Sequence, residues 1–389
     1  MKTYNFDEPI ERRHTDCFKH DALSDMYGRN DLLPMWVADM DFRTPDFVME
    51  AIRHRCDHPV LGYTMPGEGY WQAVTGWLAR HYGIHTTKEE LHFIPGIVAG
   101  ISYALLCLTQ PGDKILVTTP VYHPFLHVPT DAGRVVVDSP LRIVDGRFAI
   151  DFDDFEQKAE GCKLFIMSNP HNPAGTVWGE EVLRHVADIC ERKGITVISD
   201  EIHADLTLPG HCHVSYSTVC TEAAHHSITF MAPSKTFNIA GLGSSVCYIG
   251  DEAIRKRFFG WLDSLGVSGG NIFAFTAAEA AFAQGEDWLV QMLDYLNRNV
   301  QTLVRFLQER MPQVKAVLPE ASYLAWLNFS AYGLSHQELA DRLINKARVV
   351  LNDGTAFGGD AYKCCFRINL GCPTATLLEA LDRIATALS

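Results

Sequence analysis

Several side chains that can do chemistry follow directly after short apolar runs in the middle of the sequence. The runs cover residues 163–167, 195–198 and 228–231. The polar residues that follow them are Asn169, His171, Asn172, Asp200, His203, Ser234 and Lys235. In open α/β sheets, ligands bind beyond the carboxyl ends of the strands. If each run is a strand, an amide, a carboxylate and an amine are therefore gathered at one edge of a sheet.

These three groups match the needs of pyridoxal phosphate. This cofactor takes a lysine for its Schiff base and an acid that keeps its ring nitrogen protonated. Lys235 and Asp200 are suited to these roles, and the amide of an asparagine in the first loop, Asn169 or Asn172, is suited to bond the ring hydroxyl. The alternative for Lys235 and Asp200 is a buried ion pair with a purely structural role.

A candidate phosphate site precedes these runs, in the stretch IPGIVAGISYALLCL (94–108). Backbone amides at the start of a helix bind phosphate well, and Gly96 stands where a strand would lead into such a helix. The alternative is an ordinary buried helix whose small residues allow close packing.

The order of the surrounding elements predicts how these groups are held. Strand-like runs alternate with helical patterns such as the one at 179–194, which Gly194 should end. Such alternation favours a mostly parallel sheet with helices on both faces. We therefore expect an α/β fold whose large domain covers residues 48–285.

The end of the chain has a different pattern. From Glu286 the leucines are spaced for a long helix, and 323–329 and 364–371 have strand-like patterns. A capping box at 335–338 should open a further helix, and a last helix should begin near Thr376. These elements predict a smaller α+β domain, which the N-terminal residues complete: 1–47 together with 286–389.

Composition limits the classes of function. The chain has 389 residues and 47% hydrophobic residues, and its net charge is −14 because 47 acidic residues outnumber 33 basic ones. This acidity argues against nucleic acid or an anionic membrane as a partner. The N-terminus lacks the apolar core of a signal peptide, and the longest apolar window is too short to span a bilayer.

The placement of cysteines and histidines bears on the cellular compartment and on metal binding. The eleven cysteines are scattered without a CxxC pair, which favours a reducing cytoplasm. Among the seventeen histidines, the densest clusters are HCHVSY (211–216) and the pair His225 and His226; neither shows helical i, i+4 pairing or the cysteine spacing of a zinc site, so we expect no metal.

Six ordered stretches make the sequence resemble a known family. It is similar to the fold-type I pyridoxal-phosphate enzymes of aminotransferase class I/II, and within them to the C–S lyases of the cystathionine β-lyase branch. The resemblance covers nearly the whole chain. The stretches are MWVADMDF (35–42), GYT (62–64), SNPHNPAGTVW (168–178), SDEIHADL (199–206), APSKTFNIAGL (232–242) and FRINLG (366–371).

The resemblance implies a role for each matching residue. Lys235 would form the Schiff base and then act as base at the substrate α-carbon, and Asp200 would pair with the pyridinium nitrogen. Tyr122 would stack on the ring and is counted with these two as catalytic. Arg367 would take the substrate α-carboxylate with its planar fork. The other expected substrate contacts are Asn172, which would also bond the phenolic oxygen of the cofactor, and Asp39.

Some positions depart from the wider family. His203 stands where aminotransferases often carry a tyrosine, and this histidine is usual in the C–S lyase branch. Gly243 replaces an arginine that often clamps the phosphate. The expected phosphate contacts are therefore the amides of Ile97 and Val98, with Ser234 and Tyr63. Tyr63 would reach across a homodimer to the cofactor of the other subunit, so that the subunits share their active sites.

The resulting expectation is a cytoplasmic C–S β-lyase. It would convert cystathionine, cysteine or other S-conjugates into a thiol, pyruvate and ammonia. One alternative is an aminotransferase, which shares the steps up to the carbanion. The other is a regulatory protein that binds a partner on the same cofactor scaffold.

Overall fold

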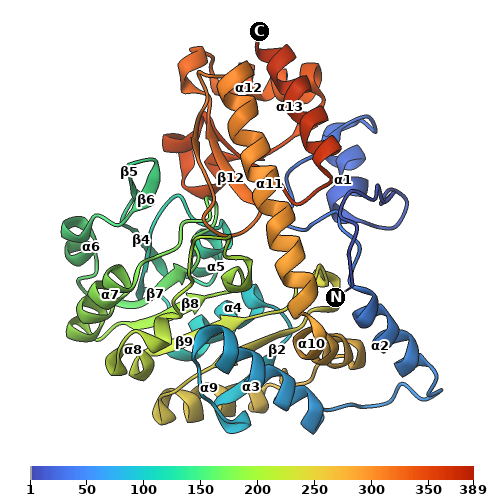
Figure 1. Ribbon diagram of the computed structural model, residues 1–389. Coiled ribbons are helices and arrows are strands. Elements are labelled where there is room, and N and C mark those ends of the chain that lie inside the picture. The colour runs from blue at the N-terminus through green and yellow to red at the C-terminus, as the bar shows by residue number, and fades with distance from the viewer. Residues whose placement is uncertain (1) are drawn as a thin grey trace.

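A seven-stranded sheet lies at the centre of the computed structural model, which describes residues 2–389 (Figure 1). Five neighbouring strands, β9, β8, β7, β3 and β4, are parallel, with β4 at one edge of the sheet. The antiparallel strand β10 joins β9 to β2 at the other edge. In spatial order the strands are β2 (Leu91–Ile94), β10 (Ser245–Tyr248), β9 (Ser227–Met231), β8 (Thr196–Asp200), β7 (Cys162–Ser168), β3 (Lys114–Val117) and β4 (Val135–Asp138). The predicted mostly parallel α/β fold is confirmed.

Helices cover both faces of this sheet because its central strands are apolar on both sides. Leu164 and Ile166 of β7 belong to the core on one face, whereas Phe165 and Met167 belong to the core on the other. The first face is covered by α4 (Ile97–Leu108), α5 (Pro124–Asp131) and α9 (Glu252–Ser264). The second is covered by α6 (Phe152–Lys158), α7 (Glu180–Lys193) and α8 (Thr221–His225).

The C-terminal part forms a second, smaller sheet. Its four antiparallel strands are, in order, β11 (Lys315–Val317), β12 (Leu324–Asn328), β15 (Cys365–Asn369) and β14 (Asn352–Asp353). The helices of this part are α11 (Glu286–Arg310), α12 (His336–Asp341) and α13 (Thr374–Leu388). In Figure 1, α11 runs from the lower, larger part of the molecule into the upper part that holds this sheet.

The N-terminal segment lies against the C-terminal part. After α1 (Phe18–Tyr27), the short strand β1 (Leu33–Pro34) pairs in parallel with β13 (Val349–Val350). The chain then enters α2 (Asp46–Cys56) and α3 (Glu68–Tyr82), which pack on α10 (Ile272–Gln284). We propose the division of the chain at residues 47/48 and 285/286 on the basis of this arrangement.

Local signals in the sequence explain where several helices begin and end. Gly194 ends α7 in the left-handed conformation, with φ of 65°, which glycine adopts without strain. Ser335 accepts a bond from the amide of Glu338 in the expected capping box. The last helix begins at Thr374, two positions before the expected Thr376. Pro373 occupies its N-cap position, and the residue before a proline is disfavoured in a helix, so the helix extends no further towards the N-terminus. No helix among residues 2–389 is both long and apolar enough to cross a membrane.

A close contact between α4 and β9 gives a test of this packing. A Cβ atom at Gly100 would lie 2.6 Å from Cε1 of Phe230 and 3.0 Å from Cγ2 of Ile94. Gly100→Ala should therefore destabilise the protein by about 1–3 kcal/mol through overpacking. In a Phe230→Leu background the same substitution should be less harmful, because the ring is gone. Thermal unfolding of the wild type, the two single variants and the double variant measures the coupling between the two substitutions. If their effects on stability are additive, the contact is contradicted.

Candidate active site

The register of the large sheet brings three strand ends side by side. Asp200, the last residue of β8, lies opposite Ser168 of β7 and Phe230 of β9. The loop after β7 carries Asn172, and the loop after β9 carries Lys235. The charge of Asp200 and the charge of Lys235 each act on the pKa of the other residue. The acid and the amine therefore lie close together at this edge.

Asp200 is a buried acid without a cationic partner. Its side chain accepts one hydrogen bond, 3.1 Å from the amide of Ile202, and only 5% of the residue is exposed. Within residues 2–389 the carboxylate forms no ion pair, not even with Lys235. Burial raises its pKa to about 7. The structural ion pair that the sequence left open is therefore not formed in the described part of the chain.

Lys235 is partly buried, and its amine is held by the main chain. Nζ donates to the carbonyl oxygen of Ala38 at 2.5 Å. Burial lowers the pKa of Lys235 to about 8, although the charge of Asp39 acts in the opposite direction. An amine with such a pKa is available in its neutral form near neutral pH, which a nucleophile or base requires.

Arg367 is a buried guanidinium surrounded by neutral acceptors. It donates to Oδ1 of Asn172 at 2.9 Å, to the carbonyl of Trp36 at 3.2 Å and to Oδ1 of Asn352 at 2.5 Å. Its Nε is buried without a partner, and no carboxylate of the described chain pairs with it. Burial lowers its pKa to about 10. A free carboxylate that entered the site would meet an unpaired cation.

Two more of the expected residues lie near these groups. His203 is buried with its Nδ1 unpartnered, and burial lowers its pKa to about 3, so the ring is neutral. Tyr122 is partly buried, and burial raises its pKa, an effect that the charge of Arg367 opposes. The charges of Lys235 and Arg367 both act on His203.

The expected phosphate end has a suitable backbone. Helix α4 begins at Ile97 after Gly96, so the amides of Ile97 and Val98 precede the first intrahelical hydrogen bond, which Gly100 donates to Gly96. Such free amides attract anions. Ser234 is buried just before Lys235.

The structure explains why glycine occupies position 243. Gly243 has φ of 59°, and a Cβ there would lie 2.8 Å from the carbonyl oxygen of Pro95, directly before the start of α4. A long side chain such as arginine would therefore be both strained and crowded at this position.

Two expected contacts are placed differently from the rest. The carboxylate of Asp39 is bound by both terminal nitrogens of Arg12, at 3.2 and 2.7 Å, so it is already occupied within the chain. Its expected contact with the substrate stays a prediction. Tyr63 is fully exposed on the segment between α2 and α3. Its expected contact would lie with a second subunit and also stays a prediction.

The sequence did not single out several residues that support the site. Tyr323 donates to the carbonyl of Ala38 at 2.9 Å, and Thr236 donates to Asp205 at 2.7 Å, beside the lysine. Asn352 holds Arg367. Ala38 and Trp36 act through main-chain carbonyls, which no side-chain pattern reveals. Asn352 and Tyr323 lie more than 80 residues from Lys235 and carried no local signal.

The donor set fits pyridoxal phosphate. An amine of lowered pKa suits its aldehyde, an unpaired buried acid suits its ring nitrogen, and free amides at a helix start suit its phosphate. Among residues 2–389, no group of three or more metal-binding side chains is placed to hold a metal ion.

Comparison with known proteins indicates the same class of protein, the pyridoxal-phosphate enzymes. The family profile of aminotransferase class I and II matches residues 31–384. The chain is 44% identical to the cystathionine beta-lyase PatB of Bacillus subtilis, over 99% of this chain and 100% of that protein.

Two solved structures are similar to this one. Cystalysin from Treponema denticola matches with a TM-score of 0.96 at 32% identity, covering 100% of this chain and 99% of that one. The C-S lyase from Staphylococcus hominis matches with a TM-score of 0.92 at 36% identity, covering 100% of this chain and 98% of that one. Both of those structures contain pyridoxal phosphate.

The chain belongs to the aminotransferase class I and II family, and the resemblance to its C–S lyase branch is confirmed.

The raised pKa of Asp200 predicts a pH-dependent stability for the cofactor-free protein. Between the ordinary carboxyl pKa of 3.8 and the folded pKa of about 7, the folded protein binds a proton that the unfolded chain has released. Stability is therefore lost as pH rises through this window. Asp200→Asn removes the effect. From pH 4 to pH 7 the free energy of unfolding of the variant should therefore rise relative to that of the wild type, by at most about 4 kcal/mol. Urea unfolding of both proteins across this pH range measures the difference. If the free energies of unfolding of the wild type and the variant change with pH in parallel, the raised pKa of Asp200 is contradicted.

Proposed function

We propose that this protein is a pyridoxal-phosphate-dependent C–S β-lyase that acts on cystathionine, cysteine or other S-conjugates of the same type. The observation that carries the proposal is the set of Lys235, Asp200 and Arg367, which lie around one site and form no ion pair within the part of the chain that the structure describes. The names of the relatives support the choice of a C–S bond, since they include a cystathionine beta-lyase and a C-S lyase.

Pyridoxal 5'-phosphate is the cofactor, and when bound it supplies an electron sink for the negative charge that develops at the substrate α-carbon. Lys235 would hold its aldehyde, Asp200 its ring nitrogen and Asn172 its phenolic oxygen. The amides of Ile97 and Val98, with Ser234, would hold its phosphate.

The chain's own groups account for binding and proton transfer. Arg367 would bind the α-carboxylate of the amino acid, and Asn172 and Asn352 keep its fork in place with neutral oxygens. Lys235, with a pKa of about 8, would take the α-proton on Nζ. Asp200 would keep a proton at the ring nitrogen, where two opposite charges stabilise each other in a dry site. Loss of the thiolate from the β-carbon, followed by hydrolysis of the product by water, would then give pyruvate and ammonia.

The branch determines the fate of the charge at the α-carbon. An aminotransferase would place a proton on the cofactor, whereas a lyase expels the β-substituent. His203 is a neutral ring in this part of the site, where aminotransferases often have a tyrosine. This difference and the named relatives favour elimination.

Lys235→Ala tests the assignment directly. The variant should fold but lose pyruvate release from cystathionine on the order of a thousandfold, because both the base and the covalent attachment are gone. The assay contains cystathionine and cofactor but no 2-oxo acid, so that transamination gives no sustained turnover. Lys163→Ala, at an exposed position on β7, is the matched control and should keep its activity. Normal turnover by Lys235→Ala would overturn the assignment.

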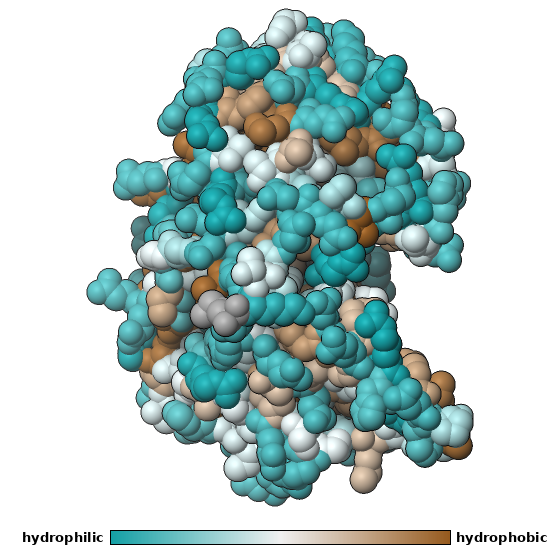
Figure 2. All heavy atoms as spheres, turned by 45° about the vertical axis from the view of Figure 1, so that its right-hand side comes forward, coloured by the Kyte–Doolittle hydropathy of each residue, from teal (hydrophilic) through white to brown (hydrophobic). Residues whose placement is uncertain are grey.

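We also propose a cytoplasmic homodimer in which each active site draws on both chains. All eleven cysteines are free, which suits a reducing compartment. The segment between α2 and α3 exposes four large apolar side chains, those of Val60, Leu61, Tyr63 and Met65. It projects from the lower right of the molecule in Figure 1, and Figure 2 shows brown residues on the projecting corner. Apolar groups that project in this way are typical of an interaction surface.

Subunit exchange tests the shared site. Tyr63→Phe should weaken retention of the cofactor, because the hydroxyl would reach the phosphate of the other subunit. In a mixed dimer of Tyr63→Phe and Lys235→Ala, one site carries both changes and the other carries neither. Activity after exchange in mild denaturant should exceed the average of the two parents, each treated alone in the same way. If it does not, Tyr63 serves its own chain only.

A further inference from the structure

Four charged side chains form a compact cluster beside the active site. Arg12 and Lys19 come from the N-terminal segment, and Asp39 and Asp41 come from the segment that follows β1. Arg12 lies 2.7 Å from Asp39 and 2.6 Å from Asp41, and Lys19 lies 2.7 Å from Asp41 and 3.7 Å from Asp39. The side chain of Lys19 is only 1% exposed. The cluster contains two cations and two anions, so its charges balance.

The cluster holds main chain as well as side chains. Arg12 also donates to the carbonyl of Met40 at 3.2 Å, and Lys19 donates to the carbonyl of Asp39 at 3.3 Å. Burial alone would raise the pKa of Asp41, but the charge of Lys19 and the hydrogen bonds hold it well below its usual range. The carboxylate of Asp41 therefore stays charged near neutral pH.

Segment 36–41 is fixed from other directions too. Asn238, three residues after Lys235, donates to the carbonyls of Met40 and Phe42, both at 2.8 Å. Asn369 of β15 donates to the carbonyls of Val37 and Asp39, at 2.6 and 2.7 Å. The segment thus lies between the lysine loop and the small sheet, with the cluster on the N-terminal side.

The same segment contacts the two cations of the active site. The carbonyl of Ala38 accepts from Nζ of Lys235, and the carbonyl of Trp36 accepts from Arg367. The indole of Trp36 in turn donates to the carbonyl of Lys19 at 2.9 Å. The position of Lys235 therefore depends on how firmly residues 36–41 are held, whereas Arg367 has two further acceptors in Asn172 and Asn352.

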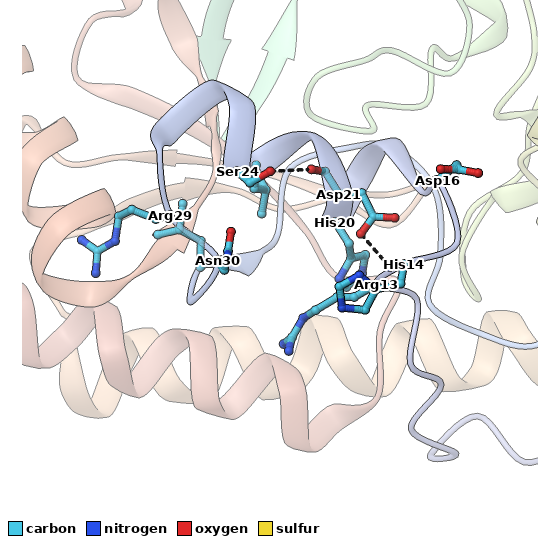
Figure 3. Close-up of a pocket in the computed structure, with 10 residues that line it drawn as sticks. Arg13, His14, Asp16, His20, Asp21, Ser24, Arg29 and Asn30 are labelled. Atoms are coloured by element: carbon cyan, nitrogen blue, oxygen red, sulfur yellow. Dashed lines mark hydrogen bonds between the residues drawn. The ribbon is translucent and has the colours of Figure 1, made fainter.

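The N-terminal segment has its own network of hydrogen bonds. Asp21 of α1 accepts from the amides of His14, Thr15 and Cys17, at 2.9, 3.1 and 3.0 Å. This carboxylate fixes a turn in which His14 and Asp16 have positive φ, a conformation that needs such support. Figure 3 shows Asp21 bonded to His14, with His20 on the same side of the helix, around a cavity of about 470 Å³. These hydrogen bonds therefore hold in place the backbone that carries Arg12 and Lys19.

We propose that Arg12 and Lys19 are positioning residues of the reaction: with Asp39 and Asp41 they fix segment 36–41 so that the Ala38 carbonyl receives the free amine of Lys235. The role rests on the proposed function, because Lys235 is free only while it is not attached to the cofactor. A fixed acceptor would hold the released amine close to the α-carbon, whereas a mobile acceptor would let it rotate away.

Arg12→Met is the primary test, since Arg12 is the more exposed of the two cations, at 21%. Its kcat for pyruvate release should fall about tenfold, because the base is less often in position. KM should change by less than about twofold, since Asn172 and Asn352 still hold Arg367. Arg12→Lys keeps the charge and should recover much of the loss.

A second measurement does not depend on activity. In the cofactor-free protein, amide hydrogen exchange of residues 36–41 should become about tenfold faster in Arg12→Met, while the central strands stay unchanged. Lys193→Met is the matched control, because Lys193 forms a pair of similar length, 2.6 Å to Glu160, on α7. It should alter neither the exchange of 36–41 nor kcat.

The outcomes separate the two proposals. If the wild type releases pyruvate but Arg12→Met behaves like Lys193→Met in both measurements, the positioning role is wrong. If Arg12→Met only lowers the melting temperature and keeps its kcat, the cluster is structural and the positioning role is also wrong. If the wild type releases no pyruvate while exchange of 36–41 still rises, the proposed reaction fails and the support of the segment stands.

Discussion

The edge of the large sheet gathers three ionisable side chains, and no residue among 2–389 provides any of them with a counter-ion. Asp200 and Arg367 are buried, and Lys235 is partly buried. Taking a charge out of water without a partner is strongly unfavourable. The chain reduces this penalty in two ways. Burial moves the pKa of Asp200 up and that of Lys235 down, so both become easier to neutralise, and Arg367 is surrounded by neutral oxygens.

The rest of the structure keeps these groups apart and in place. Parallel strands fix the acid and start the lysine loop, the small sheet supplies Arg367, and the segment after β1 supplies carbonyl acceptors to both cations. A bound cofactor and an amino-acid substrate would then provide the missing opposite charges. In the cofactor-free protein these buried groups lower the stability of the fold, and binding of the cofactor and the substrate would recover that free energy. The fold is thus less stable at the place where the proposed function requires these groups.

The fold was predictable because its signals are local. The apolar runs of β7, β8 and β9, the glycine after α7 and the capping box at Ser335 each depend on neighbouring residues. The family motifs then pointed to Lys235, Asp200 and Arg367, and the structure brings these close to one another. The surroundings of these residues were harder to predict from the sequence. The contact of Asp39 with the substrate stays a prediction, and the bond that its carboxylate accepts from Arg12, 27 residues earlier in the chain, had no signal in the sequence.

Main-chain contacts explain most of what was missed. Ala38 and Trp36 act through carbonyl groups that every residue has, so their role follows from position and not from residue type. The cluster that fixes them joins residues whose charges, read in sequence, resemble an ordinary polar N-terminus. Only the folded chain shows that Lys19 is buried and that its partners lie in the segment that contacts Lys235.

The central claim is that the site holds Lys235 in a desolvated environment without an ion pair. The pKa of this amine in the cofactor-free protein tests it most directly. Reductive methylation of the lysines with isotopically labelled formaldehyde, followed by NMR across a pH series, gives that pKa, and the Lys235→Ala protein identifies the signal. The account predicts a value of about 8. A value at or above the ordinary 10.5 would show that the amine is solvated or paired, and would contradict the account.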